Sequence, residues 1–137
     1  MYSRIIVAVD LEHLDQARAL LQRAGQLIDA GGEIRLLHVL EEVPGFIAAE
    51  LPADLAERRR AEAAVELRAM IDPAAGLRVE HEVRRGAASG QIIQAAEDSL
   101  AELIMIASHK PGLQDYFIGS TAARVIRHAQ CSVLVER

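Results

Sequence analysis

The sequence predicts a single α/β domain, residues 1–137, built as a three-layer sandwich with a five-stranded, mostly parallel sheet between helices. Two observations favour this fold class. Residues 5–9 and 103–107 are short, fully apolar runs, which is typical of strands covered on both faces. Between the predicted strands, apolar residues recur every three or four positions, as in helices packed on a sheet. With 51% hydrophobic residues, the 137-residue chain has enough apolar side chains for one core.

Residues 5–31 predict the first strand and helix. The β-branched run at residues 5–9 is the strand, and Asp10 stands at its carboxyl end. The glycine pair Gly31-Gly32 is expected to end the helix that follows. One helical face is traced by five apolar residues: Leu14, Ala17, Leu21, Ala24 and Ile28.

A second strand is predicted at residues 34–40, interrupted by Arg35 and His38, and a surface loop at residues 41–52. Within that loop, the segment 44–46 is either a lid over a ligand or plain surface. Residues 53–71 are rich in helix formers, and their arginines at 58–60 form either a solvated face or a basic ligand patch. The expected apolar face of this helix is Ala61, Ala64, Leu67 and Ile71.

The second half of the chain predicts three more strands and two more helices. Residues 77–84 alternate between apolar and charged side chains, as in an edge strand with one solvated face. A helix follows Gly86, and strands are expected at residues 103–107 and 131–135. The apolar positions expected to pack are Ile92, Ile93, Ala96 and Leu100 in the first of these helices, and Ala122, Val125, Ile126 and Ala129 in the second.

The strand order 3-2-1-4-5 satisfies these patterns, because it places the half-solvated third strand at an edge and the apolar first and fourth strands centrally. Ligands of such sheets bind outside the carboxyl ends of the strands, where the order reverses. Asp10, Ser108 and Gly119 should therefore converge. With Ser120 and Thr121, Gly119 opens a helix whose positive end suits an anion. Two alternatives stay open: Asp10 caps the first helix, and the segment 119–121 is an ordinary helix start without a ligand.

The last strand is expected at the opposite edge, where its apolar run carries no charge. A bare apolar edge invites pairing with another chain. The sequence therefore predicts a homodimer related by two-fold symmetry through four residues, Ser132, Val133, Leu134 and Val135.

Composition narrows the function classes. A net charge of -5 argues against nucleic-acid or membrane partners, and the 3% aromatic content leaves few platforms for stacked bases. Cys131 is the only cysteine, so no internal disulfide forms, and a reducing cytoplasm suits the chain. No metal-ligand spacing is shown by His13, His38, His81 and His128, and no Walker loop or nucleophile elbow is present. We therefore expect neither a metal site nor an efficient hydrolase.

The sequence segments described above resemble those of the universal stress protein family. The resemblance extends from the first strand and Asp10 to Gly119-Ser120 and the closing segment 125–135. It implies a Rossmann-like fold of the adenine nucleotide alpha hydrolase type and dimerisation through the last strand. Its ATP-binding members carry a motif of Gly, two residues, Gly, nine residues, Gly and then Ser or Thr. This chain has Ala107 and Lys110 at the first two glycine positions and eight residues, 111–118, before Gly119.

The resemblance implies ATP as the ligand, or AMP or ADP, with Mg²⁺ as an accompanying ion. Asp10 would face adenine and ribose, next to the backbone of Ala8 and Val9, while Val39 or Leu40 would offer main-chain contacts to the base. The segment 107–110 would pass the ribose and phosphates, where Lys110 would either crowd them or supply a cation. The implied binding residues are Ala8, Val9, Asp10, Val39, Leu40, Ala107, Ser108, His109, Lys110, Gly119, Ser120, Thr121 and Ala122.

Three functions stay open at this point. The first is a cytoplasmic, homodimeric nucleotide-binding stress sensor or regulator, in which ATP changes the segment 108–118. The second is a dimeric interaction module without nucleotide, which the residues at the two glycine positions favour. The third is a slow ATP hydrolase, for which Asp10 and His109 are the candidate residues.

Overall fold

The computed structural model describes residues 1–41, 52–108 and 119–137. The described strands form one sheet of order β3-β2-β1-β4-β5, and every neighbouring pair is parallel. The predicted fold class and strand order are therefore confirmed. The elements are β1 (Tyr2–Ala8), α1 (Leu14–Leu27), β2 (Ile28–Leu40), α3 (Leu55–Ala69), the short 3₁₀ helix η1 (Pro73–Ala75), β3 (Arg78–Arg85), α4 (Ala88–Ser99), β4 (Leu103–Ala107), α5 (Ser120–His128) and β5 (Ser132–Glu136).

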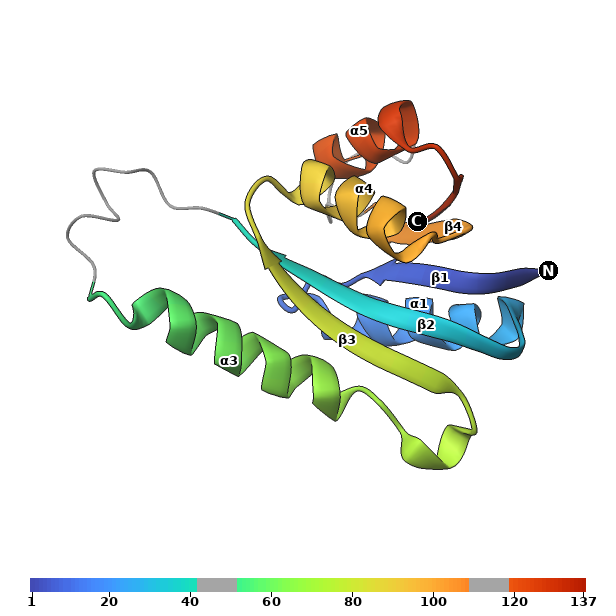
Figure 1. Ribbon diagram of the computed structural model, residues 1–137, viewed down its shortest axis with the longest axis horizontal. Helices are drawn as coiled ribbons and strands as arrows, with labels where there is room; N and C mark the ends of the chain where they lie inside the picture. Colours follow the sequence, from blue (N-terminus) through green and yellow to red (C-terminus); the bar gives the residue numbers. More distant parts are fainter. Residues whose placement is uncertain (42–51, 109–118) are drawn as a thin grey trace.

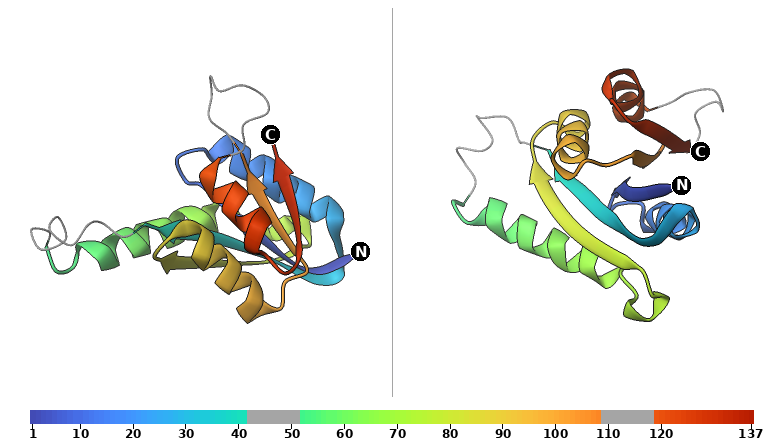
Figure 2. Two further views of the ribbon diagram at one scale, coloured as in Figure 1. Left: turned by 90° about the horizontal axis from the view of Figure 1, so that it is seen from above. Right: turned by 45° about the vertical axis from the view of Figure 1, so that its right-hand side comes forward.

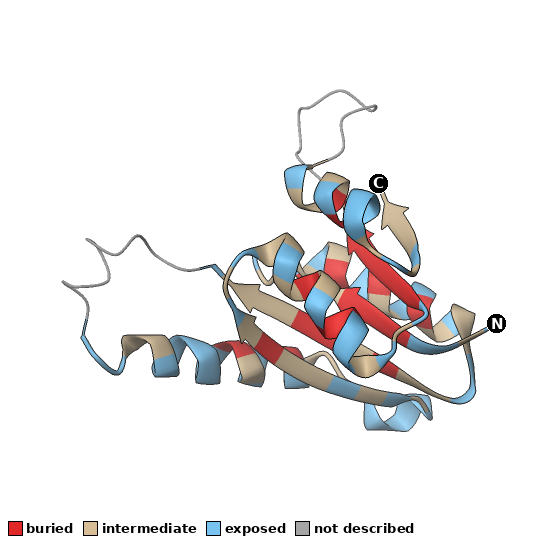
Figure 3. Cartoon of the chain, turned by 45° about the horizontal axis from the view of Figure 1, so that its top comes forward, coloured by how far each residue is buried: buried red, intermediate tan, exposed pale blue. Residues whose placement is uncertain are grey.

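Helices cover both faces of the sheet (Figures 1 and 2), with α1 and α3 on one face and α4 and α5 on the other. The two faces follow from the alternation of side chains along a strand. In β1, Ile5 and Val7 pack toward α1, whereas Ile6 packs toward α4 and α5. Figure 3 shows the buried residues concentrated in the central strands, as their apolar runs predict. Leu103 to Ile106 in β4 are all buried.

The end of the first helix differs from the prediction. Helix α1 stops at Leu27, and Ile28 already has extended backbone (ψ 139°) and pairs with Tyr2 of β1. The pairing then shifts register before Glu33. Gly31, with φ +79°, lies in this irregular stretch, so it shapes the start of β2 rather than ending the helix. A Cβ on Gly32 would approach the Ile28 side chain to 2.8 Å, which explains the second glycine.

Several predicted helix faces are rotated or shortened. Helix α1 buries Leu20 where Leu21 was expected, and the buried residues of α3 are Ala63 and Leu67, with Ala61 exposed. Leu100 ends α4 in a left-handed conformation (φ 55°) and is 70% exposed, and Ile126 is 45% exposed. Alanine-rich helices such as α3 make these shifts hard to predict, because small apolar residues occur all round them.

The two edge strands lie where the sequence predicts. Strand β3 pairs only with β2, and β5 pairs only with β4, among the described residues. However, β5 extends to Glu136, whose carboxylate lies 3.2 Å from the guanidinium of Arg23. The last strand therefore carries one charge at its carboxyl end, contrary to the prediction of an edge without charge.

Glu102, just before β4, links the start of β4 to the start of β1. Its Oε1 accepts hydrogen bonds from the backbone N–H groups of Ser3 (2.7 Å) and Arg4 (3.3 Å) and from the Ser3 hydroxyl. These bonds, that of the Ser3 hydroxyl foremost, lower the pKa of the Glu102 carboxyl from its ordinary value of 4.5. The carboxylate thus contributes stability above about pH 4.5, and this contribution is lost as the pH falls through the lowered pKa.

We expect Glu102→Gln to lower the melting temperature by a few degrees at pH 7, because a neutral amide accepts these hydrogen bonds less strongly. The difference from the wild type should shrink as the pH falls below about 4.5 toward the lowered pKa, at which the wild-type carboxyl also becomes protonated. Thermal denaturation followed by circular dichroism between pH 3 and pH 7 measures it. Glu97→Gln, an exposed change on α4, is the control. An equal difference at pH 3 and pH 7 would contradict the assignment.

Candidate functional site

A cleft of about 670 Å³ opens where the strand order reverses, outside the carboxyl ends of β1 and β4. Strands β1 and β4 lie side by side, with Ile5 opposite Leu103 and Val7 opposite Met105. From their ends the chain leaves toward α1 on one face and toward α5 on the other, so backbone separates at this point. The volume is in the range of small-molecule sites. The cleft therefore has both the position and the size of a ligand site.

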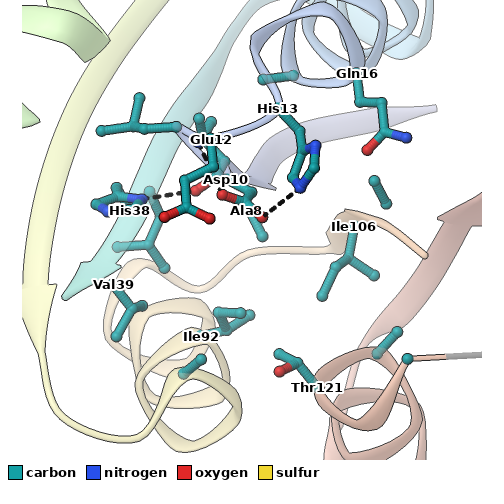
Figure 4. A pocket seen from close by; sticks show the side chains of 18 of the residues that line it. Ala8, Asp10, Glu12, His13, Gln16, His38, Val39, Ile92, Ile106 and Thr121 are labelled. Carbon is teal, nitrogen blue, oxygen red and sulfur yellow. Dashed lines mark hydrogen bonds and ion pairs between the residues drawn. The ribbon is translucent and has the colours of Figure 1, made fainter. Parts of the chain in front are cut away.

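The cleft brings together every predicted site residue that the structure describes. His109 and Lys110, like the segment 44–46, lie outside the described residues. The predicted residues that line it are Ala8, Val9, Asp10, Val39, Leu40, Ala107, Ser108, Gly119, Ser120, Thr121 and Ala122. Figure 4 shows the side chains of several of them around the opening.

Ser108 joins the end of β4 to the start of α5. Its Oγ accepts a hydrogen bond from the Gly119 N–H (3.0 Å), and its own N–H donates to the Glu136 carbonyl (2.8 Å). Gly119 is the N-cap of α5 and has no side chain to cap the helix. The N–H groups of Ser120 and Thr121 therefore lack an intrahelical acceptor and a side-chain cap. They lie at the positive end of the α5 dipole, and both residues line the cleft.

Asp10 lies at the opposite wall of this opening. Its Oδ1 accepts a hydrogen bond from the Glu12 N–H (3.0 Å), and its Oδ2 lies 3.9 Å from the Nε2 of His13. The N-cap of α1 is His13, and no side-chain hydrogen bond caps that helix. Asp10 is thus not the N-cap residue of α1, which was the alternative interpretation. Its carboxylate instead shapes the turn at the mouth of the cleft and is exposed there.

The floor of the cleft is held by the ends of β1 and β2. The Val9 N–H donates to the Leu37 carbonyl (2.8 Å), and the Val9 carbonyl lies 2.8 Å from the Nδ1 of His38. An N–H on that nitrogen makes this a hydrogen bond. His38 therefore fixes the backbone just before Asp10, a role that the sequence pattern did not reveal. Figure 4 shows this pair and the contact between Asp10 and His13 as dashed lines.

The lining residues that were not predicted as site residues include His13, Gln16 and Arg59. Arg59 comes from α3. Because it lines the cleft, it favours the interpretation of the arginines at 58–60 as a basic ligand patch over that of a solvated face. No periodicity marks these residues, because only the packing of α1 and α3 brings them to the cleft. Gln16 is distinctive, since its Oε1 is shielded from solvent and accepts no hydrogen bond from a described residue.

The part of the chain that the structure describes shows neither a metal-ligand cluster nor a thiol with a lowered pKa. No group of three or more His, Cys, Asp or Glu side chains there is arranged to hold a metal ion. Burial raises the pKa of the Cys131 thiol, which disfavours the reactive thiolate. No helix among these residues is both long enough and apolar enough to cross a membrane.

Comparison with known proteins identifies the family. The model of the universal stress protein family matches residues 1–137. The chain belongs to the universal stress protein family. Universal stress protein G of Shigella flexneri is 34% identical over 148 aligned positions that cover all of both chains. The resemblance inferred from the sequence is thereby confirmed.

Solved structures share the fold of this universal stress protein. The structure of protein MJ0577 superposes with a TM-score of 0.82 at 25% identity, over 98% of this chain and 95% of that one. A universal stress protein in complex with cAMP has a TM-score of 0.62 at 23% identity, over 99% and 97% of the two chains. One from Archaeoglobus fulgidus in complex with dAMP has a TM-score of 0.64 at 22% identity, over 99% and 98%.

Proposed function

We propose that this universal stress protein binds an adenine nucleotide, ATP foremost, in the cleft outside β1 and β4, and acts as a stress sensor or regulator. The observation that carries the proposal is the start of α5. Ser108 fixes Gly119, and Ser120 and Thr121 line the cleft together with Asp10. An uncapped helix N-terminus at the switch point of a parallel sheet is suited to phosphate.

The two ends of the cleft differ in polarity in a way that suits a nucleotide. Val39, Leu40 and Ile92 give the end near β2 and α4 an apolar lining for a base. The main-chain groups of Val39 and Leu40 are the proposed partners of the base edge, with Ala8 and Val9 below it. At the other end, Gly119 to Ala122 are the proposed phosphate ligands, and residues 107–110 are proposed to pass the ribose and phosphates.

The solved relatives support adenine as the base. Two structures of this fold hold cAMP and dAMP. Both ligands combine adenine, a sugar and one phosphate, so AMP and ADP are proposed as further ligands beside ATP. Because the described residues form no metal-ligand cluster, Mg²⁺ in this cleft would be held mainly by nucleotide phosphates and water.

The proposed active form is a cytoplasmic homodimer that pairs through Ser132 to Val135 of β5. The strand carries partly buried apolar side chains, and it pairs only with β4 among the described residues. Nucleotide binding at Ser108 and Gly119 would be transmitted to the segment between them, whose two ends these residues hold. The proposed signal is therefore a change in residues 108–118 that a partner protein reads.

Isothermal titration calorimetry with ATP and Mg²⁺ tests the proposal. We expect saturable binding of one nucleotide per chain with a dissociation constant below about 1 mM, a typical upper limit for a specific small-ligand site. GTP should bind more weakly, because its base edge presents different donors and acceptors. Absence of binding at millimolar ATP, AMP and ADP would reject the nucleotide function and leave the dimeric interaction module as the remaining reading.

A further inference from the structure

Gln16 carries a hydrogen-bond acceptor that the fold leaves unsatisfied. The residue lies in the first turns of α1 and lines the cleft. Its Oε1 is shielded from solvent and accepts no hydrogen bond from any residue of segments 1–41, 52–108 and 119–137. A buried amide oxygen without a donor destabilises the fold.

The surroundings of Gln16 explain why the fold offers no donor. The neighbouring residues of the same wall, Ala17 and Leu20, are apolar and buried, as is Ile106 at the end of β4. In Figure 4, Gln16 projects toward the cleft on the α1 side of Ile106, while Thr121 lies on the α5 side. The nearest open space is therefore the cleft itself. Because Oε1 is shielded in this conformation, a turn of the Gln16 side chain toward the adjoining cleft would let it accept a hydrogen bond from an O–H or N–H group of a ligand at this wall.

The order of apolar and polar residues along the cleft indicates which part of a bound nucleotide would lie beside Gln16. A base at the apolar end near Val39 and Ile92 and phosphates at Ser120 and Thr121 leave the sugar in the middle, next to Ile106. The hydrogen-bond donors of a ribose are its hydroxyl groups. We infer that the Oε1 of Gln16 accepts a hydrogen bond from a ribose hydroxyl, so that this residue selects ribonucleotides over deoxyribonucleotides. This inference rests on the nucleotide function proposed above.

Gln16→Met tests the inference, because methionine has a similar length but offers no strong acceptor. Calorimetry with ATP, 2′-deoxy-ATP and 3′-deoxy-ATP measures the preference. The wild-type protein should bind ATP about five- to tenfold more tightly than at least one deoxy analogue, the size expected for one neutral hydrogen bond. Gln16→Met should bind ATP weaker by a similar factor and bind all three nucleotides within about twofold. Gln16→Glu, which keeps an acceptor, should retain the preference.

Two controls separate recognition from stability. Gln22→Met, an exposed change on the same helix, should leave all three affinities unchanged. The melting temperature of ligand-free Gln16→Met should equal or exceed that of the wild type, because an unsatisfied oxygen has been removed. A lower melting temperature, or a Gln16→Met protein that keeps both its ATP affinity and its preference, would overturn the inference while leaving nucleotide binding intact. If the wild type binds no nucleotide, the proposed function itself fails.

Discussion

Replacing Ser120 by aspartate is expected to weaken ATP binding about 100-fold or more. Ser120 is the first residue of α5 and faces the cleft, so the new carboxylate would stand where the phosphates are proposed to bind. Two negative charges about 4 Å apart near a protein surface repel by roughly 4 kcal/mol. The same carboxylate favours the helix itself, since it lies at the positive end of the dipole. Binding should therefore fall while the ligand-free protein keeps or gains thermal stability.

Calorimetry and thermal denaturation of the Ser120→Asp protein measure these opposite effects. Ser120→Ala is the matched control, because it removes the hydroxyl but keeps the backbone N–H. Its ATP affinity should drop only about three- to tenfold, as expected for loss of one hydrogen bond to an anion. If Ser120→Asp binds ATP as tightly as the wild type, the start of α5 does not hold the phosphates.

The second large effect is expected at the edge of β5. Leu134→Lys should convert a dimer into a monomer of 14.9 kDa, because two-fold pairing of β5 strands would bring the two lysines close together. Size-exclusion chromatography with light scattering measures the mass, and circular dichroism shows whether the variant is folded. A charged residue on an edge strand opposes edge pairing even where the strand stays in its sheet.

Val65→Lys provides the control for charge alone. Val65 is 64% exposed on α3, which packs near β2 and β3 at the opposite edge of the sheet. That variant should keep the wild-type mass. A folded Leu134→Lys protein with the mass of the wild-type dimer would exclude β5 as the interface, and a monomeric wild type would exclude the proposed dimer altogether.

The sequence predicts most of this fold because its strands carry strong local signals. The runs at 5–9 and 103–107 are apolar at every position, which only central strands tolerate, and the alternation at 77–84 marks an edge. The observed strand order, and hence the place of the cleft, satisfies these signals. The end of α1 was mispredicted because it depends on the pairing of Ile28 with Tyr2, a contact that local sequence does not encode.

The site was predictable only where it follows from topology. Asp10, Ser108 and Gly119 stand at the ends of elements, so their convergence follows from the strand order. Gln16 and Arg59 lie within helices, and the rotation and tilt of α1 and α3 decide whether they face solvent or the cleft. His38 likewise needed the structure, because its contact with the Val9 carbonyl joins two strands. Site residues that lie within helices can therefore be recognised only once the packing of those helices is known.

The most direct test of nucleotide binding in this cleft is a nuclear magnetic resonance titration of the isotope-labelled protein with ATP and Mg²⁺. We expect saturable shifts of the backbone amides of Asp10, Gly119, Ser120 and Thr121, which line the cleft from both sides. The amide of Gly76, in the turn after η1, should stay unchanged. No shifts at millimolar ATP, or saturable shifts confined to residues outside the cleft, would contradict the account.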